Sequence, residues 1–209
     1  MSRQDVSNLV IAGRSKLIAA AVQAALDEGE NATDILAAMI GAMDVVGERF
    51  RNNEIFVPEM LVAARAMKKG VDVLKPHLSS GEVGGMGKMI IGTVQGDLHD
   101  IGKNLVAMMI ESAGFEVVDL GVDVPRERFV EAVRENPDTK IVGLSALLTT
   151  TMPALRDAVA LLNRQDFRGN IKVMVGGAPI TQEFADEIGA DAYTADAASA
   201  AQMAKRLAS

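Results

Sequence analysis

The chain has no cysteine among its 209 residues, and it has no excess of positive charge, because its 28 Asp and Glu outnumber its 21 Lys and Arg. Without cysteine, neither a disulfide nor a metal site built from thiolates can form. The formal net charge is −7 and the isoelectric point is about 4.9. A protein that binds nucleic acid normally presents a basic face to the phosphates, so we expect no nucleic-acid partner.

Long apolar stretches are also missing. No run approaches the 18 or so apolar residues of a transmembrane helix, and the first seven residues, Met1–Ser7, have no apolar signal region. We therefore expect a cytoplasmic protein with no membrane partner. The content of hydrophobic residues, 49%, is ample for a core, and the length suits one large domain or two small ones.

The composition changes at residues 79–87, where serine and glycine replace bulky apolar residues. Such a segment is typical of a linker between domains. Before it, apolar residues recur at helical spacing. They predict one stripe over 9–21, a helix through 35–50 with Thr33 as its N-cap, and a helix from Pro58 to about Met67 that Gly70 breaks. The prediction for residues 1–78 is a small helical bundle.

After the linker, short β-branched runs alternate with amphipathic segments. The predicted strands are 88–94, 116–120, 140–145, 171–175 and 191–193. The predicted helices lie near 101–113, 125–135, 152–164, 180–188 and 196–207. Five βα units predict a flavodoxin-like, doubly wound parallel sheet over 88–209, with the strand order 2-1-3-4-5. The fold class is therefore α/β with a helical N-terminal domain.

One loop of this sheet carries a histidine where ligands usually bind. The predicted strand ends at Val94 and the next predicted helix begins near Ile101, so His99 lies at the carboxyl end of a strand. Asp97 can accept a hydrogen bond from the imidazole ring and so fix its tautomer. The candidate site residues of this loop are Gly96, Asp97, Leu98, His99, Asp100, Ile101 and Gly102.

Two further blocks follow in the same order along the chain. Ser145-Ala146-Leu147 ends the third predicted strand, and Gly176-Gly177 follows the fourth, with residues 103–144 and 148–175 in between. Together with Asp97-x-His99-x-x-Gly102, they resemble the cobalamin-binding signature DxHxxG…SxL…GG. That signature is shared by methionine synthase, methylmalonyl-CoA mutase and the corrinoid proteins of methyltransferases.

The resemblance implies a role for each block. His99 would be the lower axial ligand of cobalt in place of the cofactor's own base. Asp97 would hydrogen-bond the other ring nitrogen, and the hydroxyl of Thr151 would complete that relay. The implied contacts around the cofactor's nucleotide tail involve Ser145, Thr149 and Ala197, with room for the tail left by Gly102, Gly176 and Gly177. Leu147, in the second block, would also belong to the cofactor site.

Simpler readings of the same residues stay open from the sequence. His99 could be a solvated loop histidine. Asp97 and Ser145 could cap helices, which is a common role for their residue types. The run from Thr149 to Pro153 reads equally well as the start of a helix.

The helical part extends the resemblance over nearly the whole chain. The run Glu54–Leu61, continued by Ala64–Gly70, resembles the cap domain of methionine synthase and of the corrinoid proteins that serve methylamine, methanol, betaine and aromatic O-demethylation. In that family the cap covers the upper face of the corrin. By this resemblance we expect Phe56 and Met60 to contact the cofactor.

The resemblance implies a methyl carrier that is no enzyme on its own. With two histidines and no cysteine, the chain has no zinc-type site to activate a thiol, and its length is taken up by the two domains. A substrate-specific methyltransferase would methylate cob(I)alamin. A second methyltransferase would take the methyl group from methylcob(III)alamin to tetrahydrofolate or coenzyme M, and a corrinoid reactivation protein would serve the same system.

Two alternatives belong to other classes. The chain could be the cobalamin-binding subunit of an adenosylcobalamin mutase, although mutases generally lack the cap. It could also be a B12-responsive regulatory module, but the sequence has no basic segment for a DNA-binding partner domain.

Overall fold

The structure is a computed structural model that describes residues 2–78 and 85–208. The chain divides into two compact units, one made of Met1–Gly85 with Glu111–Gly114 and the other of Met86–Ile110 with Phe115–Ser209. By their main described segments, we call them the helical unit (residues 2–78) and the α/β unit (residues 86–208). Most of the predicted linker, residues 79–84, lies outside the described residues. Within the described parts, no helix is long and apolar enough to span a membrane.

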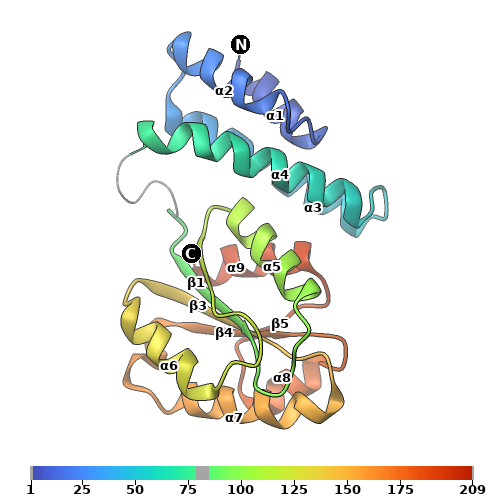
Figure 1. Cartoon of the computed structure of the whole chain (residues 1–209), viewed down its shortest axis with the longest axis vertical. Helices are drawn as coiled ribbons and strands as arrows, with labels where there is room; N and C mark the ends of the chain where they lie inside the picture. Colours follow the sequence, from blue (N-terminus) through green and yellow to red (C-terminus); the bar gives the residue numbers. More distant parts are fainter. Residues whose placement is uncertain (1, 79–84, 209) are drawn as a thin grey trace. The chain divides into compact units, whose positions relative to one another are not determined.

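The helical unit is a four-helix bundle closed by a short 3₁₀ turn (Figure 1). Helix α1 packs on α3, and α4 packs on both α3 and α2. The bundle core consists of apolar side chains at helical spacing, including Val6, Val10, Ile18, Val22, Ile35, Met39, Met60, Met67 and Leu74. The elements are α1 (Arg3–Ile11), α2 (Ile18–Asp27), α3 (Ala32–Arg51), α4 (Val57–Leu74) and η1 (Lys75–His77).

The predicted stripe over 9–21 is wrong as a single element. Helix α1 ends at Ile11, and Gly13 adopts a left-handed φ of +65° that turns the chain before α2 begins. Leu17, which the stripe placed in the core, is 56% exposed. The apolar spacing continues across the turn between α1 and α2, and Gly13 was the signal that α1 ends before it.

Two details of the other helices also differ from the prediction. The N-cap of α3 is Asn31, whose side chain accepts a hydrogen bond from the backbone N–H of Thr33 at 2.8 Å, so Thr33 is not the cap. Gly70 does not break α4, because it lies inside the helix where the methyl end of Met39 packs against it. A glycine at a close helix crossing is a packing residue here.

The α/β unit contains a five-stranded parallel sheet in the order β2-β1-β3-β4-β5, as predicted. Its strands are β1 (Lys88–Thr93), β2 (Glu116–Asp119), β3 (Thr139–Ser145), β4 (Lys172–Gly176) and β5 (Ala192–Tyr193). Its helices are α5 (Ile101–Ser112), α6 (Arg126–Glu135), α7 (Met152–Asn163), α8 (Gln182–Ile188) and α9 (Ala197–Ala208), with the 3₁₀ turns η2 (Thr149–Thr151) and η3 (Asp166–Asn170).

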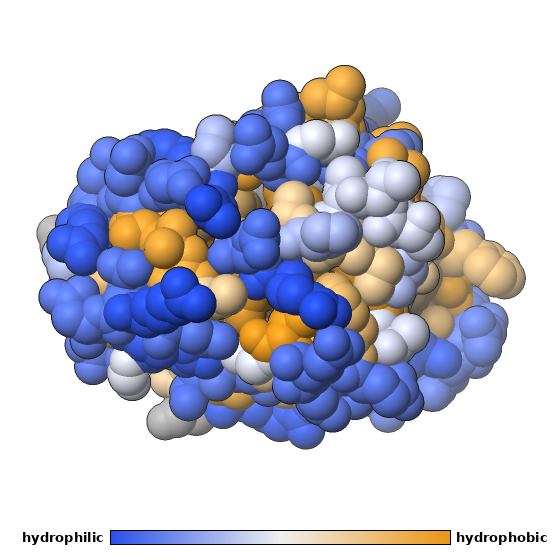
Figure 2. Space-filling view, turned by 90° about the horizontal axis from the view of Figure 1, so that it is seen from below, coloured by the Kyte–Doolittle hydropathy of each residue, from blue (hydrophilic) through white to orange (hydrophobic). Residues whose placement is uncertain are grey.

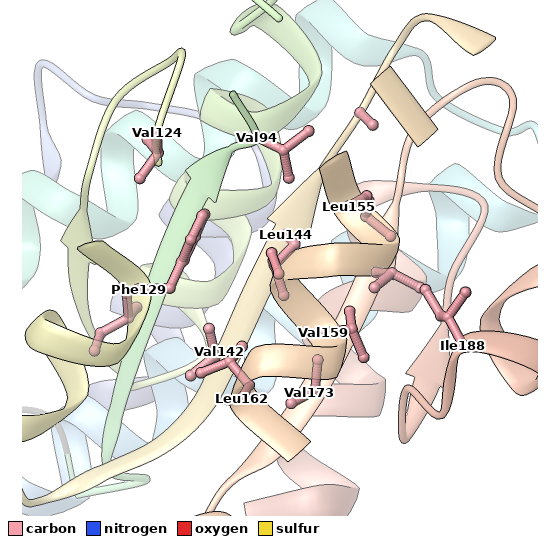
Figure 3. Packing of buried hydrophobic residues seen from close by; sticks show 14 of the residues in the cluster. Val94, Val124, Phe129, Val142, Leu144, Leu155, Val159, Leu162, Val173 and Ile188 are labelled. Atoms are coloured by element: carbon pink, nitrogen blue, oxygen red, sulfur yellow. The ribbon is translucent and has the colours of Figure 1, made fainter. Parts of the chain in front are cut away.

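Helices cover both faces of the sheet. Figure 1 shows α5 and α9 on one side and α6, α7 and α8 on the other. In Figure 3, Leu155, Val159 and Leu162 of α7 meet strand residues of the sheet, among them Val142, Leu144 and Val173. These strands are almost continuously apolar, as expected for a sheet buried on both faces.

The outer surface of the α6–α8 layer is mainly hydrophilic (Figure 2). Its charged side chains pair with one another, as Arg128 does with Glu135 and Arg156 with Glu187. Because these pairs are exposed, this face is solvated, and such pairs contribute little to stability.

Because all strands are parallel, the carboxyl ends of β1, β3 and β4 lie at one edge of the sheet. The backbone N–H of Val94 donates to the carbonyl of Ser145 at 3.0 Å, and that of Ala146 donates to the carbonyl of Gly176 at 3.1 Å. The strand order reverses between β1 and β3, which is where open α/β sheets bind ligands. The three sequence blocks therefore meet at this edge.

Candidate functional site

Asp97 is the centre of the site, and its side chain is fully buried. One carboxylate oxygen, Oδ2, accepts hydrogen bonds from the backbone N–H of Leu147 at 2.7 Å and from the hydroxyl of Thr151 at 2.8 Å. The other, Oδ1, accepts from the backbone N–H of His99 at 3.1 Å and lies 2.7 Å from the Nδ1 atom of its ring. Residues that are 50 and 54 positions apart in the sequence are thus joined through one carboxylate.

The pKa of Asp97 reflects two opposing effects. Burial raises it, but the hydrogen bonds from Leu147, from His99 and from Thr151 favour the charged form and lower the pKa well below its usual range. The carboxylate is therefore ionised at neutral pH and can only accept hydrogen bonds.

The ionised Asp97 decides the tautomer of His99. Since a carboxylate accepts, Nδ1 of the ring must carry the proton that points at Oδ1. The lone pair of the neutral ring then lies on Nε2, for which no hydrogen bond is found within the described residues. The side chain of His99 is 49% exposed, so the ring is accessible to a ligand.

The backbone of His99 is held from the other side by Thr93, which the sequence analysis missed. Thr93 is the last residue of β1 and is completely buried, and its hydroxyl donates to the carbonyl of His99 at 2.9 Å. A buried hydroxyl at the end of a strand needs a partner, and this was the available signal. His99 is thereby held by hydrogen bonds at both its ring and its backbone.

Exposed apolar side chains lie in the histidine loop and in the loop whose backbone donates to Asp97. Leu98 is 72% exposed and Ile101 is 85% exposed, while Leu147 and Leu148 are partly exposed on the facing loop. Leu148 was not among the predicted residues. An apolar patch of this kind, with a few fixed polar groups, is typical of a site that covers a large organic ligand.

The three glycines differ in the space that is available for a side chain. A Cβ added to Gly102 would meet nothing within 4 Å, so this glycine borders open space. Gly177 has a φ of +127°, and a Cβ there would collide with the carbonyl of Ala146, so close backbone packing already accounts for it. A Cβ on Gly176 would stand 3.5 Å from the carbonyl of Thr194, an ordinary contact.

The remaining predicted residues of the α/β unit lie at or near the same edge. Ser145 is the last residue of β3, where it pairs with Thr93 in the register of the sheet. Thr149 is exposed at the start of η2, and Ala197 is buried at the start of α9. Asp100 and Gly96 are exposed in the histidine loop, and the amide of Asn104 donates to Asp100 at 3.1 Å.

The two predicted residues of the helical unit have opposite environments. Phe56 precedes α4 and is 65% exposed, and its backbone N–H donates to the carboxylate of Glu59 at 3.1 Å. Met60, one turn later, is completely buried. Phe56 presents its ring on the surface, whereas contact between Met60 and a bound molecule would require its surroundings to open.

The residues around His99 suit a metal ion whose other ligands come from a bound cofactor. No group of three or more His, Asp or Glu side chains suited to a metal ion occurs in the part of the chain that the structure describes. A single imidazole, oriented by a carboxylate and surrounded by apolar side chains, instead matches the axial ligand of a metal held in a macrocycle.

The family comparisons agree with this geometry. Residues 87–203 match a family described as "B12 binding domain", and residues 2–75 match a second family with the same description. The chain is 44% identical over 206 residues to a dimethylamine corrinoid protein of Methanosarcina acetivorans, with 98% of this chain and 96% of the relative covered.

Two solved structures are similar over nearly all of the chain. A cobalamin-binding protein from Desulfitobacterium hafniense has a TM-score of 0.83 and 32% identity, covering 99% of this chain and 98% of that one. The methanol:cobalamin methyltransferase complex MtaBC from Methanosarcina barkeri has a TM-score of 0.83 and 29% identity, covering 97% of this chain and 78% of that one. The chain therefore belongs to the B12-binding family, and within it to the corrinoid proteins of methyltransferase systems.

Proposed function

We propose that this chain is the methyl-carrying corrinoid subunit of a methylamine-type methyltransferase system, with His99 as the protein ligand of cobalt. The observation that carries the proposal is the pairing of Asp97 with Nδ1 of His99 at 2.7 Å, which leaves Nε2 of a half-exposed ring as the nitrogen that can bind cobalt at the switch point of the sheet. The relatives that are named dimethylamine corrinoid proteins support a methylated amine as the methyl source.

In this proposal the chain positions the cofactor and the methyltransferases perform the catalysis. When bound, the corrinoid supplies a cobalt that is methylated as Co(I) and demethylated as Co(III). Asp97 and Thr151 keep the proton on Nδ1 of His99, and the exposed apolar side chains at positions 98, 101 and 147 offer an apolar surface to the corrin. Gly102 and Ser145 border the path of the nucleotide tail, together with Thr149, Gly176, Gly177 and Ala197, and Gly96 and Asp100 belong to the loop that holds the cofactor.

The partners follow from the same proposal. One methyltransferase delivers the methyl group from the amine, and a second transfers it to tetrahydrofolate or coenzyme M. A reactivation protein returns oxidised cofactor to the working state. The site of action is the cytoplasm.

The test of the axial ligand uses both histidines of the chain. The full chain is labelled with ¹⁵N-histidine and loaded with cobalamin, and the paramagnetic resonance spectrum of the Co(II) form is recorded. We expect a splitting from one labelled nitrogen that His99→Ala abolishes. His77→Ala is the matched control and should leave it unchanged. A spectrum that survives His99→Ala would refute the assignment.

The methyl-carrier role needs a separate measurement. The reduced, loaded chain is mixed with a dimethylamine methyltransferase and dimethylamine, and the visible spectrum is followed. Methylation of the cofactor supports the proposal. Preferred binding of adenosylcobalamin, or a change of oligomeric state on loading without methylation, would instead support a mutase subunit or a regulatory module.

The helical unit is proposed to shield the cofactor, with Phe56 as a contact. The exposed ring of Phe56 is the observation that supports this role. Phe56→Ala should then speed the photolysis of bound methylcobalamin, because the radical pair is less well caged. Leu17→Ala, at another exposed apolar residue of the unit, is the control. Equal rates in both variants would exclude the contact.

A further inference from the structure

Asp123 lies in the connection between β2 and α6 and has a backbone conformation that residues other than glycine seldom adopt. Its φ is +53°, and Asn53 is the other non-glycine residue with positive φ within the described parts of the chain. Aspartate tolerates this left-handed region better than most residues, but still at a cost in free energy. Such a conformation is retained where the surrounding contacts demand it, and these positions cluster at functional sites.

The contacts of Asp123 lead directly to the histidine loop. Its carboxylate oxygen Oδ1 accepts a hydrogen bond from the backbone N–H of Gly96 at 2.7 Å. Its own backbone N–H donates to the carbonyl of Asp97 at 2.9 Å. Gly96 is itself left-handed, with a φ of +84°. Two turns with unusual backbone geometry are thus joined by two hydrogen bonds, immediately before the carboxylate that orients His99.

The connection that carries Asp123 is fixed on both sides. The backbone N–H of Thr93 donates to the carbonyl of Gly121 at 2.9 Å, and the N–H of Val124 donates to the carbonyl of Thr93 at 3.0 Å. Thr93 is the residue whose hydroxyl holds the carbonyl of His99. The β2–α6 connection and the histidine loop therefore share the end of β1 as a common support.

A buried lysine fixes the start of the same connection. Lys103, in the first turn of α5, is 3% exposed, and its Nζ atom donates to Asp119 at the end of β2 at 2.7 Å. The same carboxylate accepts the backbone N–H of Gly121 at 2.8 Å. A charged pair held in this way defines the geometry of both partners, so it links the helix that follows His99 to the loop that carries Asp123.

We propose that Asp123 is a positioning residue for His99, acting through Gly96 and Asp97. The carboxylate holds the Gly96 turn in the one arrangement in which Asp97 reaches the imidazole Nδ1, the backbone of residues 147 and 148, and the hydroxyl of Thr151 together. This inference rests on the proposed axial role of His99. It assigns to the β2–α6 connection a part in the site that none of the three signature blocks contains.

Three substitutions separate the acceptor from the backbone strain. Asp123→Asn keeps an acceptor oxygen and suits a left-handed backbone. Asp123→Ala loses the acceptor and retains the strain, whereas Asp123→Gly loses the acceptor and relieves the strain. Asp138→Ala is the control, because Asp138 is an exposed aspartate that pairs with Lys88 at the opposite end of the sheet. All variants are made in the full chain.

The first measurement uses the cofactor-free protein and so does not depend on the proposed function. We record the exchange rate of the Gly96 amide proton and the tautomer of ¹⁵N-labelled His99 by NMR. In Asp123→Ala and Asp123→Gly the exchange should rise about tenfold or more, with a mixture of ring tautomers. Asp123→Asn and Asp138→Ala should resemble the wild type. An unchanged Gly96 amide and tautomer in Asp123→Ala would overturn the proposal.

The second measurement uses the protein loaded with cobalamin. The affinity of the imidazole for Co(II), read from the fraction of cofactor with a labelled nitrogen ligand, should fall about tenfold in Asp123→Ala and Asp123→Gly alike. A purely structural role predicts that Asp123→Gly, which relieves the strain, restores the wild-type fraction, and that result would also overturn the proposal. If the wild type shows no nitrogen ligand at all, the function proposed above fails, while the NMR result still decides the role of Asp123.

Discussion

The two units of this chain differ in what they bury. The helical unit has an apolar core made of aliphatic and methionine side chains. All the buried polar side chains of the described residues belong to the segment from β1 to η2, namely Thr93, Asp97, Lys103, Ser112, Thr139 and Thr151. Burying a polar group costs free energy unless its hydrogen bonds are restored. Thr93, Asp97 and Thr151 restore theirs at the carboxyl edge of the sheet, around His99, whereas Thr139 does so at the opposite end, at the start of β3. The helical unit is therefore specified mainly by shape, whereas the carboxyl edge of the sheet is specified by hydrogen bonds.

The largest effect is expected where the sheet edge has no room for a side chain. Gly177→Ala places a methyl group against the carbonyl of Ala146 at a φ of +127°, so the free energy of unfolding should fall by about 3 kcal/mol or more. Urea unfolding followed by the fluorescence of Tyr193 measures this, because it is the single tyrosine of a chain without tryptophan.

The control for this change is Gly169→Ala, where an added Cβ meets nothing within 4 Å. Its effect should stay within about 1 kcal/mol. Equal effects at Gly177 and Gly169 would mean that the β4–α8 turn adapts freely. The turn at Gly177 and the segment after β3 that carries Ala146 would then not be fixed against each other.

A somewhat smaller loss is expected when the buried carboxylate is replaced by an amide of the same size. In Asp97→Asn, one face of the side chain turns from acceptor to donor, and the amides and hydroxyl that Oδ2 now satisfies lose partners. The free energy of unfolding should fall by about 2 to 3 kcal/mol. Asp138→Asn, at an exposed ion pair, should change it by less than about 1 kcal/mol. Similar losses in both variants would contradict the view that hydrogen bonds specify the sheet edge.

The strand order and the bounds of most α/β elements could be predicted because each unit repeats one strong pattern. The predicted strand 140–145 is observed as Thr139–Ser145, and the predicted helix 152–164 as Met152–Asn163. Once the order 2-1-3-4-5 was inferred, the shared edge of the three blocks followed from the geometry of parallel strands.

What the sequence concealed are contacts between residues that no pattern links. Asp123 reaches Gly96, and Thr93 reaches the carbonyl of His99, through the three-dimensional arrangement of loops. In the helical unit, the turn at Gly13 interrupts an apolar spacing that looks continuous, and Gly70 fits a helix crossing that spacing alone does not reveal. Periodicity reports which face is buried, but it does not report what the buried face meets.

The comparison is sharpened by a pair of glycines in the helical unit. Gly70→Ala would bring a methyl group against the end of Met39, so we expect a loss of about 1 to 2 kcal/mol, since the flexible methionine can move aside. Gly41→Ala, inside α3 with nothing within 4 Å, should stabilise the unit by about 0.5 to 1 kcal/mol. Circular dichroism should report both shifts. If the tyrosine fluorescence transition moved equally with them, the two units would unfold as one.

The smallest effect on stability is expected at the residue that matters most for the proposed function. His99→Ala removes an imidazole that is half exposed and therefore buries little apolar area. Asp97 keeps its hydrogen bonds from the backbone N–H of His99, from Leu147 and from Thr151. The free energy of unfolding of the cofactor-free chain should therefore change by no more than about 1 kcal/mol. The same urea titration that shows a large loss for Asp97→Asn serves as the measurement. If His99→Ala lost as much stability as Asp97→Asn, the imidazole would be part of the structural network, and its half-exposed ring would no longer set it apart from the buried groups around it.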